Sequence, residues 1–134
     1  MLEENIPKRI LIGKVGLDGH HRGAKYVTNI LRAAGYEVIY TGIRKSPEQI
    51  VASAIQEDVA MIGLSFLSGA HLPLFHQVVD LLKAQDADDI ILVGGGVIPP
   101  DDLAALKAMG VAEVFTPGVA DQNIIEKVAA LLKD

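Results

Sequence analysis

One short segment near the amino terminus gathers the side chains with the greatest chemical capacity in this sequence. Lys14, Asp18, His20, His21 and Arg22 stand within ten residues, with glycines among them. A neutral imidazole can bind a metal through one ring nitrogen while a nearby carboxylate accepts the proton of the other. The same residue types also suit a solvated loop, because short motifs arise often by chance. Taken alone, the segment leaves both interpretations open.

Two further positions could face a ligand. Ser65 ends the apolar stretch 59–65, where its hydroxyl could either meet a ligand or cap the following turn. The glycines at 94–96 lack the G-x-G-x-x-G spacing of a dinucleotide site. They indicate either a loose turn or a place where a bulky group lies against the backbone. His71 and His76 share a helical face poorly, so we interpret both as surface or packing residues.

The composition excludes several classes of protein. The chain has 134 residues, 50% of them hydrophobic, and a net charge of −5 from 12 basic and 17 acidic residues. A nucleic-acid binder needs a basic face, and a membrane span needs a long apolar run; the sequence has neither. It has no Cys, which excludes disulfides and thiolate chemistry. We expect one cytoplasmic domain over residues 1–134, with residues 1–7 frayed.

Apolar runs alternate with helical patterns along the chain. Runs rich in β-branched residues predict strands at 9–15, 37–40, 59–65, 89–93 and 113–115. Helical spacing predicts helices at 24–34, from 47 onward, at 73–84, from 100 to about 109, and over the last twelve or so residues. Ser46 and Gln49 form a capping-box pattern, and Gly35 and Gly110 follow helices as C′ residues do.

Five such β–α units predict a doubly wound parallel sheet between two helical layers. For five strands the flavodoxin-like order 2-1-3-4-5 is the expected arrangement, in a three-layer α/β/α architecture. Ligands of such sheets bind at the carboxyl ends of the strands. The loops that follow the first, third, fourth and fifth strands contain GLDGHHRG, SFLSGAH, GGGVIPP and TPGVAD. Their polar and glycine residues predict a ligand site at this edge.

These loops together resemble a known family. Residues 18–23 fit D-x-H-x-x-G, residues 65–67 fit S-x-L, and Gly94 and Gly95 supply a double glycine. In this order the three motifs resemble the cobalamin-binding domain of the base-off, His-on type. The similarity runs from Arg9 to Leu132 and is greatest to methylmalonyl-CoA mutase and related acyl-CoA mutases, especially in KVGLDGHHRGAK, GGGVIPP and FTPG.

The resemblance implies roles for individual residues. His20 would be the lower axial ligand of cobalt in place of the dimethylbenzimidazole base, Asp18 would accept its other proton, and Lys14 would pair with Asp18. The displaced nucleotide tail would enter a slot between the first and third strands. The residues implied at the corrin face are Gly19, His21, Arg22 and Gly23, and those along the slot are Val27, Gly63, Ser65, Leu67, Gly94, Gly95, Phe115, Thr116 and Gly118. The family usually has Asp at the position of His21, and Thr or Ser at that of Val119.

The same resemblance implies a function. The chain would be the adenosylcobalamin-binding subunit of a two-subunit acyl-CoA mutase, inactive alone, in which homolysis of the cobalt–carbon bond starts a carbon-skeleton rearrangement. At this length the acyl-CoA-binding TIM barrel would be a separate, larger subunit. Methylmalonyl-CoA is the leading expected substrate, ahead of 2-hydroxyisobutyryl-CoA and isobutyryl-CoA.

Three other functions share parts of this pattern. A corrinoid methyl carrier of a methyltransferase system usually has a helical bundle before this domain, whereas here the first strand starts by Arg9. A phosphoacceptor receiver domain needs an acidic pair after the first strand and Asp after the third, where this chain has Ser65. A free-standing cobalamin sensor would lack a barrel partner.

Overall fold

A five-stranded parallel sheet forms the centre of the protein. The computed structural model describes residues 8–14, 22–41, 46–66, 71–96, 100–115 and 121–132. Its strands follow the order β2-β1-β3-β4-β5, so the predicted flavodoxin-like topology is confirmed. The strands are β1 (Arg9–Lys14), β2 (Glu37–Tyr40), β3 (Met61–Phe66), β4 (Ile91–Gly96) and β5 (Val111–Phe115). The helices are α1 (Arg22–Ala33), α2 (Pro47–Gln56), α3 (His71–Ala84), α4 (Pro100–Ala108) and α5 (Asp121–Leu132).

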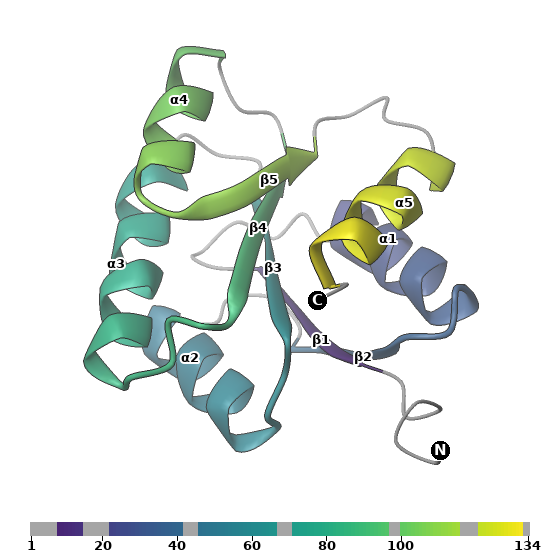
Figure 1. Ribbon diagram of the computed structural model, residues 1–134, viewed down its shortest axis with the longest axis horizontal. Helices are drawn as coiled ribbons and strands as arrows, with labels where there is room; N and C mark the ends of the chain where they lie inside the picture. Colours follow the sequence, from purple (N-terminus) through teal and green to yellow (C-terminus); the bar gives the residue numbers. More distant parts are fainter. Residues whose placement is uncertain are drawn as a thin grey trace.

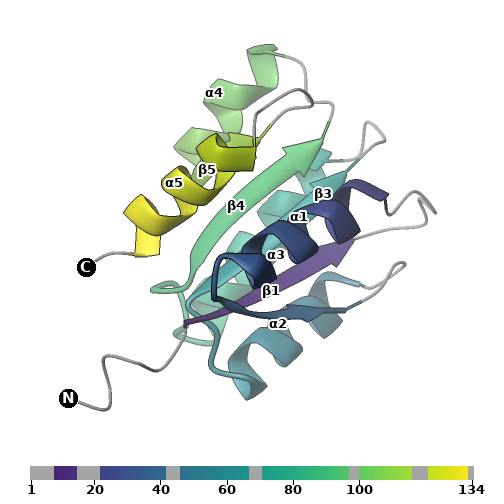
Figure 2. The same cartoon turned by 90° about the vertical axis from the view of Figure 1, so that its right-hand side faces the viewer.

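The helices cover the two sides of the sheet unequally. Helices α1 and α5 lie on one side and α2, α3 and α4 on the other, as Figures 1 and 2 show. We call these sides the α1/α5 face and the α2–α4 face. Each has its own buried cluster: Leu31, Ile124 and Val128 pack on the first, and Ile50, Phe75 and Leu106 on the second. The predicted three-layer architecture is therefore confirmed.

Local sequence signals set several helix ends. Ser46 caps α2, accepting a hydrogen bond from the Gln49 amide at 3.1 Å, while the Gln49 side chain accepts one from the Ser46 amide at 2.9 Å. The glycines that follow α1 and α4 have positive φ angles, 105° at Gly35 and 113° at Gly110. Such angles favour glycine because it has no Cβ. The predicted capping box and both C′ glycines are confirmed.

The three glycines at 94–96 belong to β4 and do not form a turn. Gly94, Gly95 and Gly96 pair with Leu64, Ser65 and Phe66 of β3. The predicted strand at 89–93 was therefore placed too early, because the structure begins it at Ile91 and carries it through all three glycines. Pairing with β3 on one side and β5 on the other offsets the low strand propensity of glycine.

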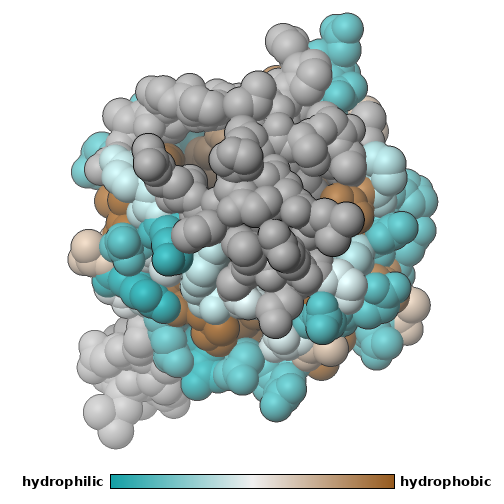
Figure 3. Space-filling view, turned by 180° about the vertical axis from the view of Figure 1, so that it is seen from behind, coloured by the Kyte–Doolittle hydropathy of each residue, from teal (hydrophilic) through white to brown (hydrophobic). Residues whose placement is uncertain are grey.

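The described surface carries few large apolar side chains. Tyr26 of α1 and Ile55 of α2 are the large hydrophobic residues found exposed there, at 53% and 40%. Seen from behind, hydrophobic patches alternate with hydrophilic residues (Figure 3). Across the described ranges, none of the helices combines the length and the apolar character that a membrane span requires.

Candidate functional site

Four of the predicted site residues form one row across the sheet. The strand register pairs Lys14 of β1 with Ser65 of β3, Ser65 with Gly95 of β4, and Gly95 with Phe115 of β5. All four lie at or next to the carboxyl ends of their strands. Residues more than 100 positions apart along the chain thus meet at the edge where ligands of doubly wound sheets bind.

The row below this one shows which face these positions occupy. This second row contains Ile12, Gly63 and Val93, each two residues before Lys14, Ser65 and Gly95, and Tyr40 of β2, which pairs with Ile12. Tyr40, Ile12 and Val93 belong to the hydrophobic cluster of the α1/α5 face or pack against it. Because side chains alternate between faces, positions 95 and 115 belong to the α1/α5 face as well, and Lys14 and Ser65 share their row in the strand register. Phe115 packs against the same cluster.

Helix α1 contributes a further predicted residue to this face. Val27 is half-buried and packs against the same cluster as Phe115 and Tyr40. The spacing of apolar residues along α1 turns this side of the helix toward the sheet. Predicted slot residues from α1, β3, β4 and β5 are therefore close neighbours on one side of the sheet, although they are widely separated in the sequence.

On this face the described residues leave room beside Gly95 but not beside Gly63. A Cβ at Gly95 would lie 3.4 Å from the carbonyl oxygen of Phe115, the one atom of the described residues within 4 Å. A Cβ at Gly63 would lie 2.8 Å from Ile12 Cδ1 and 3.6 Å from a methyl group of Val93. The neighbouring side chains thus fill the space at Gly63, whereas the described residues leave the Gly95 backbone accessible to a group lying on this face.

Gly94 faces the opposite side of the sheet. Its row partners are Leu64 and Val114, which belong to the hydrophobic cluster of the α2–α4 face or pack against it. A Cβ at Gly94 would lie 2.5 Å from Cζ of Phe75, a fully buried side chain of α3. The described contacts of Gly94 are explained by its packing against Phe75. A role of Gly94 in cofactor binding remains a prediction.

Tyr40 carries a buried hydroxyl that lacks a hydrogen-bond partner among the described residues. Burial raises the pKa of this hydroxyl above its ordinary value, so it keeps its proton at neutral pH. Buried polar groups are nearly always hydrogen-bonded, and an exception needs an explanation. Sequence analysis missed Tyr40, because a tyrosine in a strand is ordinary and the burial of its hydroxyl depends on tertiary contacts.

Several predicted residues fall outside the described part of the chain. They are Asp18, Gly19, His20, His21, Leu67, Thr116 and Gly118. Arg22 and Gly23 form the first residues of α1, whose start lies toward the arrowhead of β1 in Figure 2. The roles predicted for these residues therefore remain predictions. The described chain does place both flanks of the 15–21 segment, Lys14 and Arg22, at the carboxyl edge of the sheet.

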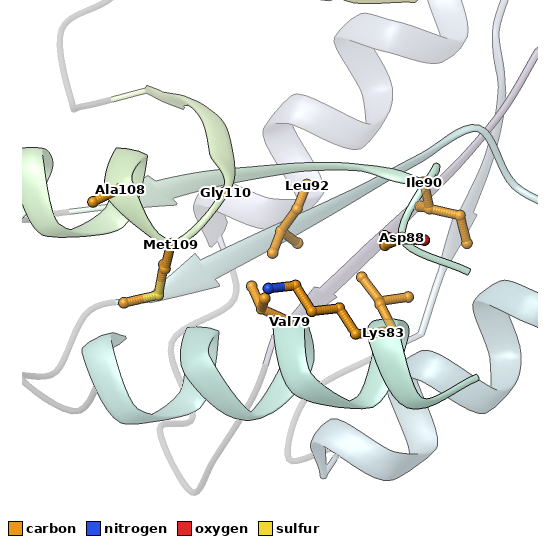
Figure 4. A pocket seen from close by; sticks show the side chains of 9 residues that line it. Val79, Lys83, Asp88, Ile90, Leu92, Ala108, Met109 and Gly110 are labelled. Atoms are coloured by element: carbon orange, nitrogen blue, oxygen red, sulfur yellow. The ribbon is translucent and has the colours of Figure 1, made fainter. Parts of the chain in front are cut away.

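A hollow of about 300 Å³ lies at the other edge of the sheet. Its lining comes from the second half of α3, the start of β4 and the end of α4, and Lys83 and Asp88 are its charged residues (Figure 4). Both charged side chains are exposed. Since β4 begins at this edge, the hollow is separate from the row of predicted site residues. His76 lies on the surface, as predicted: its side chain is 63% exposed, and its Nδ1 lies 3.1 Å from Oδ2 of Asp80, one turn further along α3.

Comparison with protein families gives a match over most of the chain. A model of the B12 binding domain matches residues 8–124. The 2-hydroxyisobutanoyl-CoA mutase small subunit of Aquincola tertiaricarbonis is 45% identical over 129 residues, covering 96% of this chain and 95% of that protein. The pivalyl-CoA mutase small subunit of Xanthobacter autotrophicus is 42% identical over 93% of this chain and 84% of that protein.

Longer proteins match through one part of their length. Ethylmalonyl-CoA mutase of Cereibacter sphaeroides is 43% identical over 119 residues, which cover 89% of this chain but 18% of that protein. Two chain lengths thus carry the same domain: small subunits of nearly this size, and mutases about five times longer.

Solved structures share the fold across different functions. A cobalamin-binding protein from Desulfitobacterium hafniense has a TM-score of 0.79 at 22% identity, over 96% of this chain and 60% of that one. A signal receiver domain from Mycobacterium tuberculosis has a TM-score of 0.73 at 14% identity, over 96% and 98%. The fold alone therefore does not separate cobalamin binding from phosphoacceptor signalling, and the sequence motifs must do so.

Proposed function

Because the chain belongs to the B12-binding domain family, we propose that it is the adenosylcobalamin-carrying small subunit of a two-subunit acyl-CoA mutase. The observation that carries the proposal is its 45% identity to a mutase small subunit over 95% of that subunit's length. A receiver domain is not supported, because position 65, next to the end of β3, is Ser where a receiver needs Asp.

The residues of the α1/α5 face fit the nucleotide tail of cobalamin. Gly95 leaves its backbone accessible, and Val27 and Phe115 supply apolar surface beside it. Lys14 and Ser65 bring polar residue types to the same row. A long ligand that is apolar in part needs such a combination of room, apolar walls and a few polar groups. The cofactor would bind base-off, with its tail in the slot between β1 and β3.

His20 is the proposed protein ligand of cobalt. Asp18 would accept the proton on the other ring nitrogen, which fixes the tautomer and the orientation of the imidazole, and Lys14 would hold Asp18 in turn. Lys14 is the last residue of β1, so this relay would start from the rigid sheet. Adenosylcobalamin supplies the radical chemistry, while the chain binds, orients and tunes it.

The acyl-CoA would bind to a larger partner subunit. The long mutases contain this domain as about a fifth of their length, which supports a separate catalytic chain in systems where the domain is a small subunit. We expect that partner to be a TIM barrel placed over the carboxyl edge of the sheet. The proposed substrate class is a short branched acyl-CoA, with methylmalonyl-CoA, 2-hydroxyisobutanoyl-CoA and pivalyl-CoA as thioesters to assay.

The proposal is tested by reconstitution and by a spectroscopic readout of the cobalt ligand. The purified chain alone should turn over no acyl-CoA, and adding the large subunit and adenosylcobalamin should restore mutase activity. In the cob(II)alamin state a bound imidazole nitrogen splits the electron paramagnetic resonance lines. Labelling the protein's histidines with nitrogen-15 should therefore change the splitting in the wild-type protein. In His20→Ala the label should have no effect on the splitting.

His21→Ala is the matched control, since it removes the adjacent histidine of the same segment. It should keep the label-dependent splitting. Turnover by the isolated chain would contradict the subunit assignment. A label effect that persists in His20→Ala would show that another histidine binds the cobalt, and methyl transfer to a thiol acceptor without mutase activity would favour a corrinoid methyl carrier.

A further inference from the structure

We propose, on the basis of the function proposed above, that the Tyr40 hydroxyl donates a hydrogen bond to the nucleotide tail of bound cobalamin. The starting point is the hydroxyl itself, which is buried and unpartnered among the described residues. Leaving such a group without a partner destabilises the free protein, so a ligand that satisfies it gains affinity.

Tyr40 lies on the face and near the edge where the tail is expected. It is the last residue of β2 and pairs with Ile12, which pairs in turn with Gly63 of β3. Its row lies two residues before that of Lys14, Ser65 and Gly95, which makes the two rows neighbours on the same face. The tyrosine also packs against the same cluster as Val27 and Phe115. Its ring therefore shares the α1/α5 face with the predicted slot.

The slot is within reach of a tyrosine side chain from β2. Neighbouring strands lie about 4.8 Å apart, which places the gap between β1 and β3 about 7 Å from β2. A tyrosine hydroxyl stands about as far as that from its own Cα. Helix α1 packs against β2, β1 and β3 on this face. The Tyr40 hydroxyl is buried from solvent, so a ligand that enters the slot is its natural partner.

The chemistry of the two groups is complementary. The Tyr40 hydroxyl is protonated at neutral pH and serves as a donor. The nucleotide tail of cobalamin offers acceptors: phosphate oxygens, ribose oxygens and a benzimidazole nitrogen that is free of cobalt in the base-off form. The corrin ring would lie outside the slot, beyond the strand ends, whereas Tyr40 lies deeper, in the row two residues before that of Lys14, Ser65 and Gly95. The tail is therefore the committed partner.

The test uses Tyr40→Phe in the full chain and measures two quantities that should change in opposite directions. The melting temperature of the free protein should rise by about 2–4 °C, because a buried hydroxyl without a partner is removed. The Kd for adenosylcobalamin should rise about 5- to 10-fold, because one hydrogen bond to the tail is lost. The Kd for cobinamide, a corrinoid without the nucleotide tail, should not change.

Tyr36→Phe is the matched control, because Tyr36 packs against the same cluster, at the residue before β2. It should leave both dissociation constants unchanged. An unchanged cobalamin Kd in Tyr40→Phe, or an equal loss of cobinamide binding, would overturn the assignment to the tail. A lower melting temperature would overturn it too, because the hydroxyl would then be satisfied in the free protein by water. Failure of the wild-type chain to bind cobalamin would instead contradict the proposed function.

Discussion

The two faces of the sheet differ most at the carboxyl ends of the strands. On the α2–α4 face, side chains of the helices occupy the space where a glycine Cβ would lie: Phe75 beside Gly94 and Ile50 beside Gly13. On the α1/α5 face, one row further on, Gly95 has a single described atom within 4 Å of its Cβ position. The same face holds the Tyr40 hydroxyl, which has no hydrogen-bond partner among the described residues.

This difference separates two roles that look identical in the sequence. Gly94 and Gly95 are neighbours of the same type, and both match the double glycine of the family. In the structure, a side chain of the protein occupies the space beside Gly94, while the space beside Gly95 suits a ligand. The α2–α4 face is thus a closed core at this point. The α1/α5 face has a proposed binding slot at the carboxyl ends of the strands. Substitutions on the two faces should affect stability and cofactor binding separately.

The largest expected effect is the loss of cobalamin binding in Gly95→Val. Valine suits a strand, and its Cβ meets little in the described protein, so the free domain should remain folded. The side chain would occupy the space of the tail, and we expect the Kd for cobalamin to rise about 100-fold, by analogy with overpacked sites that lose 1–3 kcal/mol. Titration by absorbance, with circular dichroism as a check of folding, measures both.

Gly95→Ala is the graded control for this comparison. Its single methyl group should weaken cobalamin binding less than the valine side chain does. If Gly95→Val binds cobalamin with wild-type affinity while its circular dichroism spectrum is intact, the slot lies elsewhere on the molecule.

A smaller effect, on stability, is expected for Gly94→Ala. The new methyl group would lie 2.5 Å from Cζ of Phe75, so the buried ring must shift. Overpacking of this kind costs about 1–3 kcal/mol, partly offset by about 0.5–1 kcal/mol gained when a strand glycine is replaced. We expect the free energy of unfolding in urea to fall by about 1–2 kcal/mol.

Phe75→Leu tests the cause of that loss. Leucine is smaller than the phenylalanine ring, so the double variant should be less destabilised than the sum of the two single variants. Simple additivity would show that the Gly94 methyl group does not act through Phe75. A loss of cobalamin affinity in folded Gly94→Ala, comparable to that in Gly95→Val, would show that the two faces are not separate in function.

The smallest effect is expected for Ser46→Ala, at the start of α2 on the α2–α4 face. It removes the hydroxyl that accepts the Gln49 amide, and the loss of such a cap costs about 1 kcal/mol of stability. The Kd for cobalamin should not change, because this face is closed. Ser46→Asp retains a capping oxygen and should be close to wild type. A change in cobalamin affinity in Ser46→Ala would link the two faces.

Much of the fold could be predicted because its signals are local. The Ser46 capping box and the glycines after α1 and α4 act within a few residues, and all were confirmed. The five β–α units led to the observed strand order. The predicted limits of β4 were wrong, because glycine disfavours a strand by propensity, whereas in the structure Gly94–Gly96 pair with β3, and Gly94 and Gly95 also with β5.

The sequence by itself determined the order of the elements, the helix caps and the motifs of the candidate cofactor site, since each depends on residue types at short spacing. Only the tertiary structure decided that Lys14, Ser65, Gly95 and Phe115 form one row, and that Gly94 faces Phe75 instead. It also decided that the Tyr40 hydroxyl is buried without a partner in the described protein. The physical reason is register: a shift of one residue moves every side chain of a strand to the other face, and register is set by pairing between distant segments.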